Sequence, residues 1–148
     1  VDRFASYLKE WKEFYESGED HIVICDRYVT SNMLHQTAKL DSLEEKLVFL
    51  DWEYDFEFVK GGLPVPEKVF FLDVKPEVTF RLMKDRENKI THQAKKDIHE
   101  SDQAFLVKSY ENSMILSKKY GWIKIPCCDE TDNMKSIEAI HEMLMKQL

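Results

Sequence analysis

A buried strand followed at once by a helix is predicted by the stretch Lys68-Val69-Phe70-Phe71-Leu72-Asp73-Val74-Lys75-Pro76. Its first seven residues form an almost continuous apolar run, which is typical of a parallel strand that is covered on both faces. Pro76 suits the first turn of a helix, where a backbone N–H is not needed, and that helix would carry Val78, Leu82 and Met83. A strand that leads into a helix is the building pattern of α/β proteins.

Strand and helix signals alternate along the rest of the chain. Two further apolar runs predict strands, one from His21 to Cys25 and one from Trp122 to Pro126. The polar stretch from Asp85 to Asp97 lacks apolar periodicity and is predicted to be a mobile loop. Apolar spacing and helix-ending residues predict helices from Asp2 to Ser17, from Ser31 to Lys39, from Ser42 to the Gly61-Gly62 break, from Asp97 to Gly121, and along the stripe of Ile137, Ile140, Leu144 and Leu148.

The helix that begins at Ser42 carries two patterns that disagree. Ser42 and Glu45 form the signature of a capping box, which predicts a helix start. Between residues 52 and 58, however, aromatic side chains alternate with acidic ones. Such a period of two suits a strand.

The composition excludes several classes of protein. A formal charge of −7 over 148 residues argues against a nucleic acid polymer as a partner, because such proteins gather basic residues. No apolar run approaches the ~20 residues that cross a membrane, so no membrane partner is expected. Cys25, Cys127 and Cys128 lie in strand-like runs without a Cys-x-x-Cys spacing, which predicts buried, reduced thiols in a cytoplasmic protein. The length predicts a single domain over residues 1–148.

Asp26 and Arg27 follow the predicted strand from His21 to Cys25. In an open parallel sheet, ligands bind beyond the carboxyl ends of the strands. A guanidinium there can hold a phosphate through two parallel hydrogen bonds, and a carboxylate beside it can orient the arginine or hold a metal-bound water. The competing interpretation is that Asp26 caps the next helix and Arg27 forms a surface ion pair.

The wider pattern resembles the thymidylate kinase family. The matching segments occur in the family's order and are Asp2-Arg3, Asp26-Arg27-Tyr28-Val29-Thr30-Ser31-Asn32 with His35-Gln36-Thr37-Ala38-Lys39, Gly62-Leu63-Pro64-Val65-Pro66, Phe71-Leu72-Asp73-Val74-Lys75-Pro76-Glu77, and Asp97-Ile98-His99-Glu100. The resemblance therefore runs nearly from end to end. The family begins with a strand and a glycine-rich P-loop that ends in Gly-Lys-Ser/Thr, and the 148 residues contain no such sequence.

The resemblance implies a P-loop kinase-like fold of three layers, in which a parallel sheet has helices on both faces. It also implies a helix rather than a strand over residues 52–58. In this fold the first strand lies between the strands that would end here at Asp26 and Asp73. We therefore expect the chain to lack an N-terminal segment, because unpaired backbone groups inside a sheet are costly.

The activity implied by the resemblance is transfer of the γ-phosphate of ATP to dTMP, giving dTDP, with Mg²⁺. Arg27 matches the arginine that holds the acceptor phosphate, and Asp26 matches an aspartate next to the phosphates and the metal. The other residues implied to contact dTMP are Arg3 at the thymine carbonyl, Ser31, Asn32 and Gln36 at the base, His35 in place of a common tyrosine, and Tyr110 at the sugar.

The resemblance also implies a lid that contacts ATP. Its candidate residues are Arg81, Arg86 and Lys89, with Lys95 and Lys96 beyond them, and Arg86 is the expected catalytic member. A solvated charged face is the competing interpretation for any one of them. His92 and His99 have no third ligand at a suitable spacing, so no metal site of the protein's own is predicted.

Two other functions stay open. Because nothing in the 148 residues cradles a triphosphate, the chain alone is expected to be inactive, and a catalytically inactive nucleotide-binding or interaction module is one alternative. A deoxynucleoside kinase, which also pairs an acid with an arginine after its third strand, is the other. The resemblance further implies a homodimer, for which the helices around Trp11 and Trp52 offer apolar faces.

Overall fold

The computed structural model describes residues 2–18, 21–91 and 100–148, with residues 85–91 and 100–102 described by their backbone alone. The chain divides into two compact units, Val1–Pro66 and Glu67–Leu148, which we call the N-terminal and the C-terminal unit. The prediction of a single domain over residues 1–148 stays a prediction.

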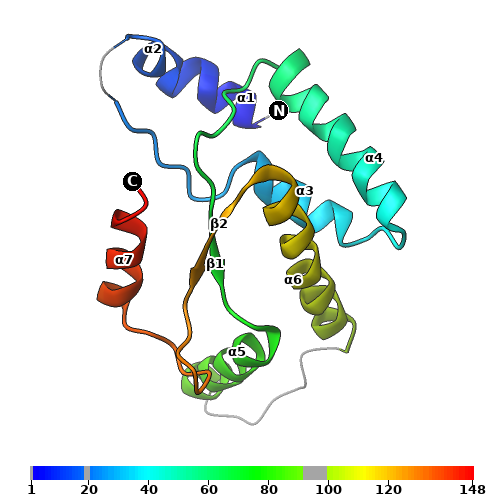
Figure 1. The fold of residues 1–148 in the computed structure, drawn as a ribbon, viewed down its shortest axis with the longest axis vertical. Helices are drawn as coiled ribbons and strands as arrows, with labels where there is room; N and C mark the ends of the chain where they lie inside the picture. Colours follow the sequence, from blue (N-terminus) through cyan, green and yellow to red (C-terminus); the bar gives the residue numbers. More distant parts are fainter. Residues whose placement is uncertain (1, 19–20, 92–99) are drawn as a thin grey trace. The chain divides into compact units, whose positions relative to one another are not determined.

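The N-terminal unit is helical throughout its described secondary structure (Figure 1). It begins with three consecutive helical segments, α1 (Asp2–Ser6), the π-helix η1 (Tyr7–Trp11) and α2 (Lys12–Tyr15), which together confirm the predicted first helix. There follow α3 (Val29–Thr37), α4 (Leu43–Tyr54) and the π-helix η2 (Asp55–Lys60), and α3 packs against α4.

The start of α4 confirms the capping box. The backbone N–H of Glu45 donates to the Ser42 hydroxyl at 3.1 Å, and the backbone N–H of Ser42 donates to the Glu45 carboxylate at 3.2 Å. Residues 52–58 are helical, so the helix predicted there is confirmed despite the period-two alternation. Trp52 and Phe56 stack on one another with ring centroids 5.5 Å apart, as residues four apart do on one face of a helix.

The strand predicted from His21 to Cys25 is wrong. Residues 21–25 form no regular secondary structure, and Ile24 is 85% exposed. A β-branched run becomes a strand only where a neighbour pairs with its backbone groups, and no segment among the described residues pairs with this one. Cys25 is exposed for the same reason, which corrects the prediction of three buried thiols, whereas Cys127 is buried and Cys128 is half-buried.

The C-terminal unit contains the sheet. Strand β1 (Phe70–Asp73) pairs in parallel with β2 (Ile123–Pro126), in a register that aligns Phe70 with Ile123 and Asp73 with Pro126. In the described part of this unit the strands are accompanied by the helices α5 (Pro76–Thr91), α6 (Glu100–Tyr120) and α7 (Ile137–Met145). Figure 1 shows α7 on one side of the strands and α6 on the other. The α/β class with parallel strands is therefore confirmed, but the described sheet has two strands rather than three.

Two further features of the C-terminal unit differ from prediction. Leu72 in β1 is 52% exposed, so this strand is less buried than its apolar sequence suggests. Helix α5 continues to Thr91, well into the predicted loop that begins at Asp85. Residues 84–91 are rich in Lys, Arg and Glu, which favour helix even without apolar periodicity. The predicted helix cap at Asp97 lies outside the described residues.

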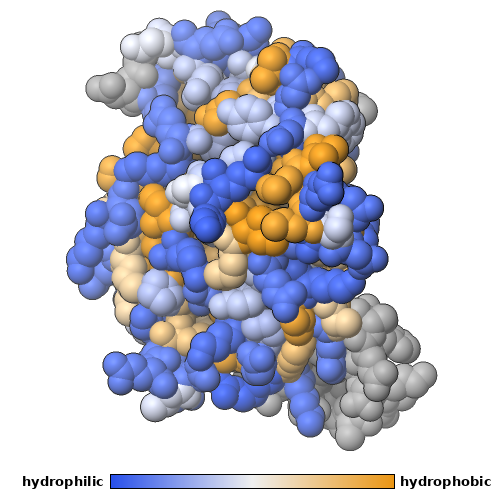
Figure 2. Space-filling view, turned by 45° about the vertical axis from the view of Figure 1, so that its right-hand side comes forward, coloured by the Kyte–Doolittle hydropathy of each residue, from blue (hydrophilic) through white to orange (hydrophobic). Residues whose placement is uncertain are grey.

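Apolar side chains form a core in each unit and also reach the surface. The fully buried ones include Met33, Leu50 and Leu63 in the first unit, and Val78 and Leu116 in the second. Figure 2 shows orange apolar side chains at the surface among blue hydrophilic ones. In the part of the chain that the structure describes, no helix is both long and apolar enough to cross a membrane.

Candidate functional site

Two buried glutamates lie at the centre of the polar contacts in the N-terminal unit. Glu53 belongs to α4 and Glu57 to η2, and their exposed fractions are 1% and 6%. With Leu50 they occupy positions 50, 53 and 57, which share one face of a helix. Because a buried carboxylate is costly unless it is hydrogen-bonded or paired, the partners of these two glutamates define the site.

Arg3 is the partner of Glu57. One terminal nitrogen of its guanidinium lies 2.5 Å from Oε1 of Glu57, so helix α1 presents this arginine to η2 across 54 residues of sequence. Phe4 supports the approach, because its ring packs so closely on Gly61 that a Cβ there would lie 2.4 Å from the ring. A guanidinium has five N–H donors, so the ion pair with Glu57 leaves donors of Arg3 for another acceptor.

Asn32 is the partner of Glu53, and it continues into a longer set of contacts that we call the amide chain: Lys39, Gln36, Asn32 and Glu53. Lys39 Nζ donates to Gln36 Oε1 at 3.0 Å, and Gln36 Nε2 donates to Asn32 Oδ1 at 3.4 Å. Asn32 Nδ2 then donates to Oε1 of Glu53. The predicted base contacts Asn32 and Gln36 therefore lie together, one turn apart on α3.

The environment of Glu53 disfavours its charged form. Burial is the largest cause and raises the pKa of this carboxyl above its ordinary value of 4.5. The hydrogen bond from Asn32 opposes the shift, the charge of Glu57 adds to it and the charge of Arg3 opposes it. The three groups that act on Glu53 are therefore the ones that form the two contacts described above.

Three buried polar atoms in this cluster are not hydrogen-bonded. Within the described residues, Arg3 Nε, Glu53 Oε2 and Glu57 Oε2 have no hydrogen-bond partner. Nearly all buried polar atoms in proteins have one. The cluster thus retains hydrogen-bonding capacity, which is what a site for a polar ligand requires.

Asp26 and Arg27 form an exposed bend immediately before α3 rather than the end of a strand. Arg27 has a φ of +66°, in the left-handed region that only glycine adopts without strain. Tyr28 is the N-cap of α3, so Asp26 does not occupy the capping position. Among the described residues no carboxylate lies within ion-pair distance of Arg27. The described residues therefore show neither the helix cap nor the surface ion pair of the competing interpretation.

Tyr28 joins two of the segments that carry the family resemblance. Its hydroxyl donates to the backbone carbonyl of Pro64 at 3.1 Å. Its pKa is raised to about 12, mainly by burial. This contact fixes the bend at residues 26–27 against the turn that follows η2.

The remaining predicted base contacts also belong to α3. Ser31 and His35 are half-buried on this helix. Burial lowers the pKa of His35, and the charges of Arg27 and Lys39 lower it further. The imidazole therefore favours its neutral form.

Tyr110 contacts a strand end in the C-terminal unit. Its hydroxyl donates to the Asp73 carboxylate at the end of β1, and its pKa is raised to about 12, mainly by burial and then by this contact. Lys124 Nζ lies 3.0 Å from the same carboxylate. In the described contacts Tyr110 thus binds the end of β1 through Asp73. Its predicted role at the sugar stays a prediction.

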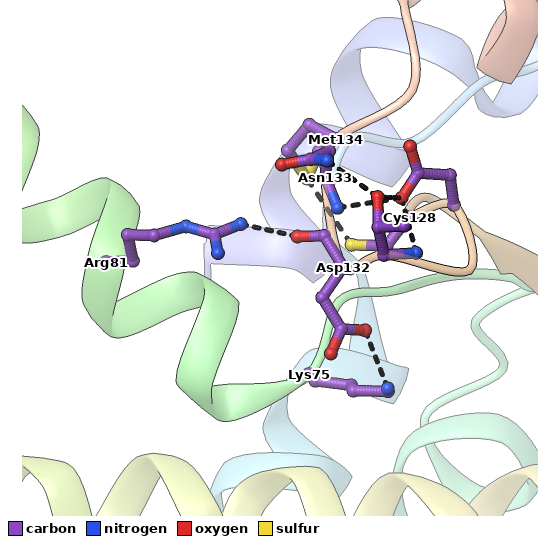
Figure 3. Close-up of polar contacts among 8 residues, drawn as sticks. Lys75, Arg81, Cys128, Asp132, Asn133 and Met134 are labelled. Carbon is purple, nitrogen blue, oxygen red and sulfur yellow. Dashed lines mark hydrogen bonds and ion pairs between the residues drawn. The ribbon is translucent and has the colours of Figure 1, made fainter.

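Arg81 contacts the loop that follows β2. It donates to the backbone carbonyl of Asp132, and Lys75 Nζ lies 2.6 Å from the Asp132 carboxylate (Figure 3). In the same loop Asp129 accepts from the backbone N–H groups of Thr131 and Asn133, each at 2.9 Å. Arg81 thus braces a loop of the C-terminal unit, and its predicted contact with ATP stays a prediction.

The other predicted lid residues are described only in part or not at all. Arg86 and Lys89 lie on α5, where the backbone alone is described. Lys95, Lys96, His92 and His99 lie outside the described residues. Among the residues that are described, no group of three or more His, Cys, Asp or Glu side chains could hold a metal ion, so no residue is assigned to Mg²⁺.

Sequence reasoning missed Glu53, Glu57 and Lys39. The glutamates form the polar half of the alternation at residues 52–58, which suggested a strand. Their spacing from Leu50 was the usable signal, because acids three and seven residues beyond an apolar core residue share its helix face. Lys39 became significant only through the contacts of Gln36.

Comparison with known proteins gives two matches. The model of the thymidylate kinase family matches residues 5–141. The chain is 26% identical over 140 residues to a probable thymidylate kinase of Methanococcus aeolicus. That alignment covers 93% of this chain and 61% of the relative, so the chain spans about three fifths of the relative's length. No solved structure matches the chain.

Proposed function

Because the chain belongs to the thymidylate kinase family, we propose that its protein transfers the γ-phosphate of ATP to dTMP, giving dTDP for nucleotide biosynthesis. The support from this chain is the cluster of Arg3, Asn32 and Gln36 around two buried glutamates. Arg3 reaches Glu57 from α1 and Asn32 reaches Glu53 from α3, so residues far apart in sequence are held in one unit. This convergence is the observation that carries the proposal.

The cluster has the hydrogen-bonding groups that a thymine base needs. Thymine offers a carbonyl oxygen, O4, and a ring N–H, N3, along one edge. In the proposal Arg3 donates to O4, while the amides of Asn32 and Gln36, with Ser31 and His35 beside them, contact the rest of that edge. Amides carry both a donor and an acceptor, so their side chains can pair with a carbonyl oxygen or with a ring N–H.

Arg27 is the proposed contact of the acceptor phosphate. Its side chain is exposed and lies one turn from Ser31 at the start of α3. A guanidinium can bind two phosphate oxygens at once, and phosphoryl transfer depends mainly on such positioning and on positive charge. Asp26 is proposed to lie next to the phosphates and Mg²⁺. Strained residues that persist are frequent at functional sites, which fits the left-handed backbone of Arg27.

Contacts with ATP are proposed for Arg81, Arg86 and Lys89, with Arg86 as the catalytic member, and a sugar contact for Tyr110. Mg²⁺ and ATP are the expected cofactor and phosphoryl donor of the family. Assembly as a homodimer and a cytoplasmic location also remain proposals.

The test is an equilibrium titration of the full-length protein, rather than of these 148 residues alone, with dTMP and with thymidine, together with an assay of dTDP formation from ATP. The proposal expects dTMP to bind more tightly than thymidine, and expects dTDP to form. Tight dTMP binding without any dTDP would favour an inactive nucleotide-binding module. Phosphorylation of thymidine in preference to dTMP would favour a deoxynucleoside kinase.

A further inference from the structure

The amide chain has one fixed direction. Lys39 at one end can only donate hydrogen bonds, and an ionised Glu53 at the other end can only accept them. Each contact between them runs the same way, from Lys39 to Gln36, from Gln36 to Asn32, and from Asn32 to Glu53. The orientation of both amides is therefore set by their neighbours.

Of the two ends of the amide chain, Glu53 has the stronger effect on the orientation of the Asn32 amide. Glu53 is buried, so its hydrogen bond with Asn32 is shielded from water, and hydrogen bonds to charged groups are the stronger ones. Lys39 is exposed, so water competes for its hydrogen bond with Gln36. The contact between Gln36 and Asn32 is long, at 3.4 Å. Glu53 is thus the group that holds the Asn32 amide in its observed orientation.

This orientation decides which atom of Asn32 is available to a ligand. Its Nδ2 donates to Glu53, whereas among the described residues its Oδ1 accepts only the long contact from Gln36 and has a second lone pair. A ligand atom that approaches this amide therefore meets an acceptor. Thymine and uracil carry a hydrogen on ring nitrogen N3 and can donate to it. Cytosine has a lone pair at the same nitrogen, so two acceptors, N3 of the base and Oδ1 of Asn32, would meet without a hydrogen between them.

We infer that Glu53 is a positioning residue: by holding the Asn32 amide with its oxygen toward the ligand, it makes this site select bases that carry a ring N–H and reject cytosine. The inference rests on the proposed function, since it assumes that Asn32 contacts the base. Mismatched buried polar groups are costly, and sites that read a donor reject analogues that lack it.

The first experiment compares the binding of dTMP and dCMP to the wild type and to Glu53→Gln. A glutamine can donate to Asn32 Oδ1, so Asn32 gains the reversed orientation. We expect the preference for dTMP over dCMP to fall about tenfold or more. Glu44→Gln, on the same helix but exposed, is the matched control and should keep the wild-type preference.

A second variant distinguishes positioning from a merely structural role. Asn32→Asp combined with Glu53→Gln exchanges the two groups, so that the glutamine amide donates to the new carboxylate and its second oxygen still faces the ligand. The pair keeps the wild-type net charge. We expect the dTMP preference to return toward the wild-type value. A double variant as indiscriminate as Glu53→Gln alone would contradict the inference.

A measurement on the wild type needs no variant to fold. The NH₂ group of Asn32 should give NMR signals that exchange slowly with water and shift as Glu53 titrates. Signals that exchange freely and ignore that titration would overturn the inference.

The positioning role of Glu53 and the proposed function can fail separately. If the wild type prefers dTMP and Glu53→Gln keeps that preference, the positioning role is wrong and the proposed function stands. If the wild type binds neither nucleotide, the proposed function is wrong and the inference falls with it.

Discussion

Asn32 on α3 donates a side-chain hydrogen bond to Glu53 on α4, and this contact joins the two helices through a buried carboxylate. Four residues further along the chain, Glu57 accepts from Arg3 on α1. Two acids on one helical face therefore hold an amide and a guanidinium that come from two other helices. A helix face that holds polar groups in this way is available for recognition as well as for packing.

The raised pKa of Glu53 predicts a particular dependence of stability on pH. A carboxyl whose pKa is higher in the folded than in the unfolded protein stabilises the fold below its ordinary value of 4.5, and this contribution is lost as the pH rises through the raised value. Glu53→Gln has no carboxyl to ionise at this position, so it does not lose this stability as the pH rises. The free energy of unfolding of the variant, relative to the wild type, should therefore increase with pH across this range in urea titrations. A difference that is flat with pH would show that Glu53 titrates normally.

The ion pair of Arg3 and Glu57 should be strongly coupled. Arg3→Met leaves a buried carboxylate without its cation and should cost about 2 kcal/mol, less than for a fully buried pair because Arg3 is partly exposed. With Glu57→Gln as the second change, a double-mutant cycle on urea unfolding should give a coupling of about 1–2 kcal/mol.

The ion pair of Lys60 and Asp55 is the matched control, because its atoms are also 2.5 Å apart but both side chains are exposed. Its coupling should lie at about 0–1 kcal/mol. Equal coupling energies for the two pairs would mean that burial does not strengthen the contact of Arg3.

Gly61 should tolerate no larger side chain. A Cβ at this position would lie 2.4 Å from the ring of Phe4 and 2.7 Å from the backbone oxygen of Glu57, which cannot move without distorting η2. We expect Gly61→Ala to destabilise the protein by about 1–3 kcal/mol in thermal or urea unfolding.

Gly18→Ala separates steric from conformational cost. Gly18 has a φ of +77° and open space around its Cβ position, so the change adds strain without a clash. It should cost about 1 kcal/mol. A smaller loss for Gly61→Ala than for Gly18→Ala would show that Phe4 and η2 adjust.

The features that sequence predicted correctly are local ones. The capping box of Ser42 and Glu45 and the helix start at Pro76 depend on residues a few positions apart, and both occur as expected. The strand predicted from His21 to Cys25 failed because a strand depends on a neighbour that the run itself does not specify.

The candidate site was predictable by residue type but not by contact. The family resemblance identified Arg3, Asn32 and Gln36. In the structure, Arg3 and Asn32 contact glutamates on neighbouring turns of one helical face. Glu53 and Glu57 hold them there, yet a glutamate between aromatic residues is normally exposed. Only the packing of α1 and α3 beside this face shows that these two are buried.

Arg27 should separate backbone strain from side-chain function. Its left-handed φ of +66° suits glycine, so Arg27→Gly should be more stable than Arg27→Ala by roughly 1 kcal/mol in urea unfolding. Both variants lose the guanidinium, and hydrogen bonds to a charged phosphate are worth about 1.5–3 kcal/mol. Both should therefore bind dTMP roughly ten- to a hundredfold more weakly, by equilibrium titration. Thymidine, which has no phosphate, is the control and should bind wild type and variants alike. If the variants weaken the binding of thymidine and of dTMP equally, Arg27 shapes the backbone and does not hold the phosphate.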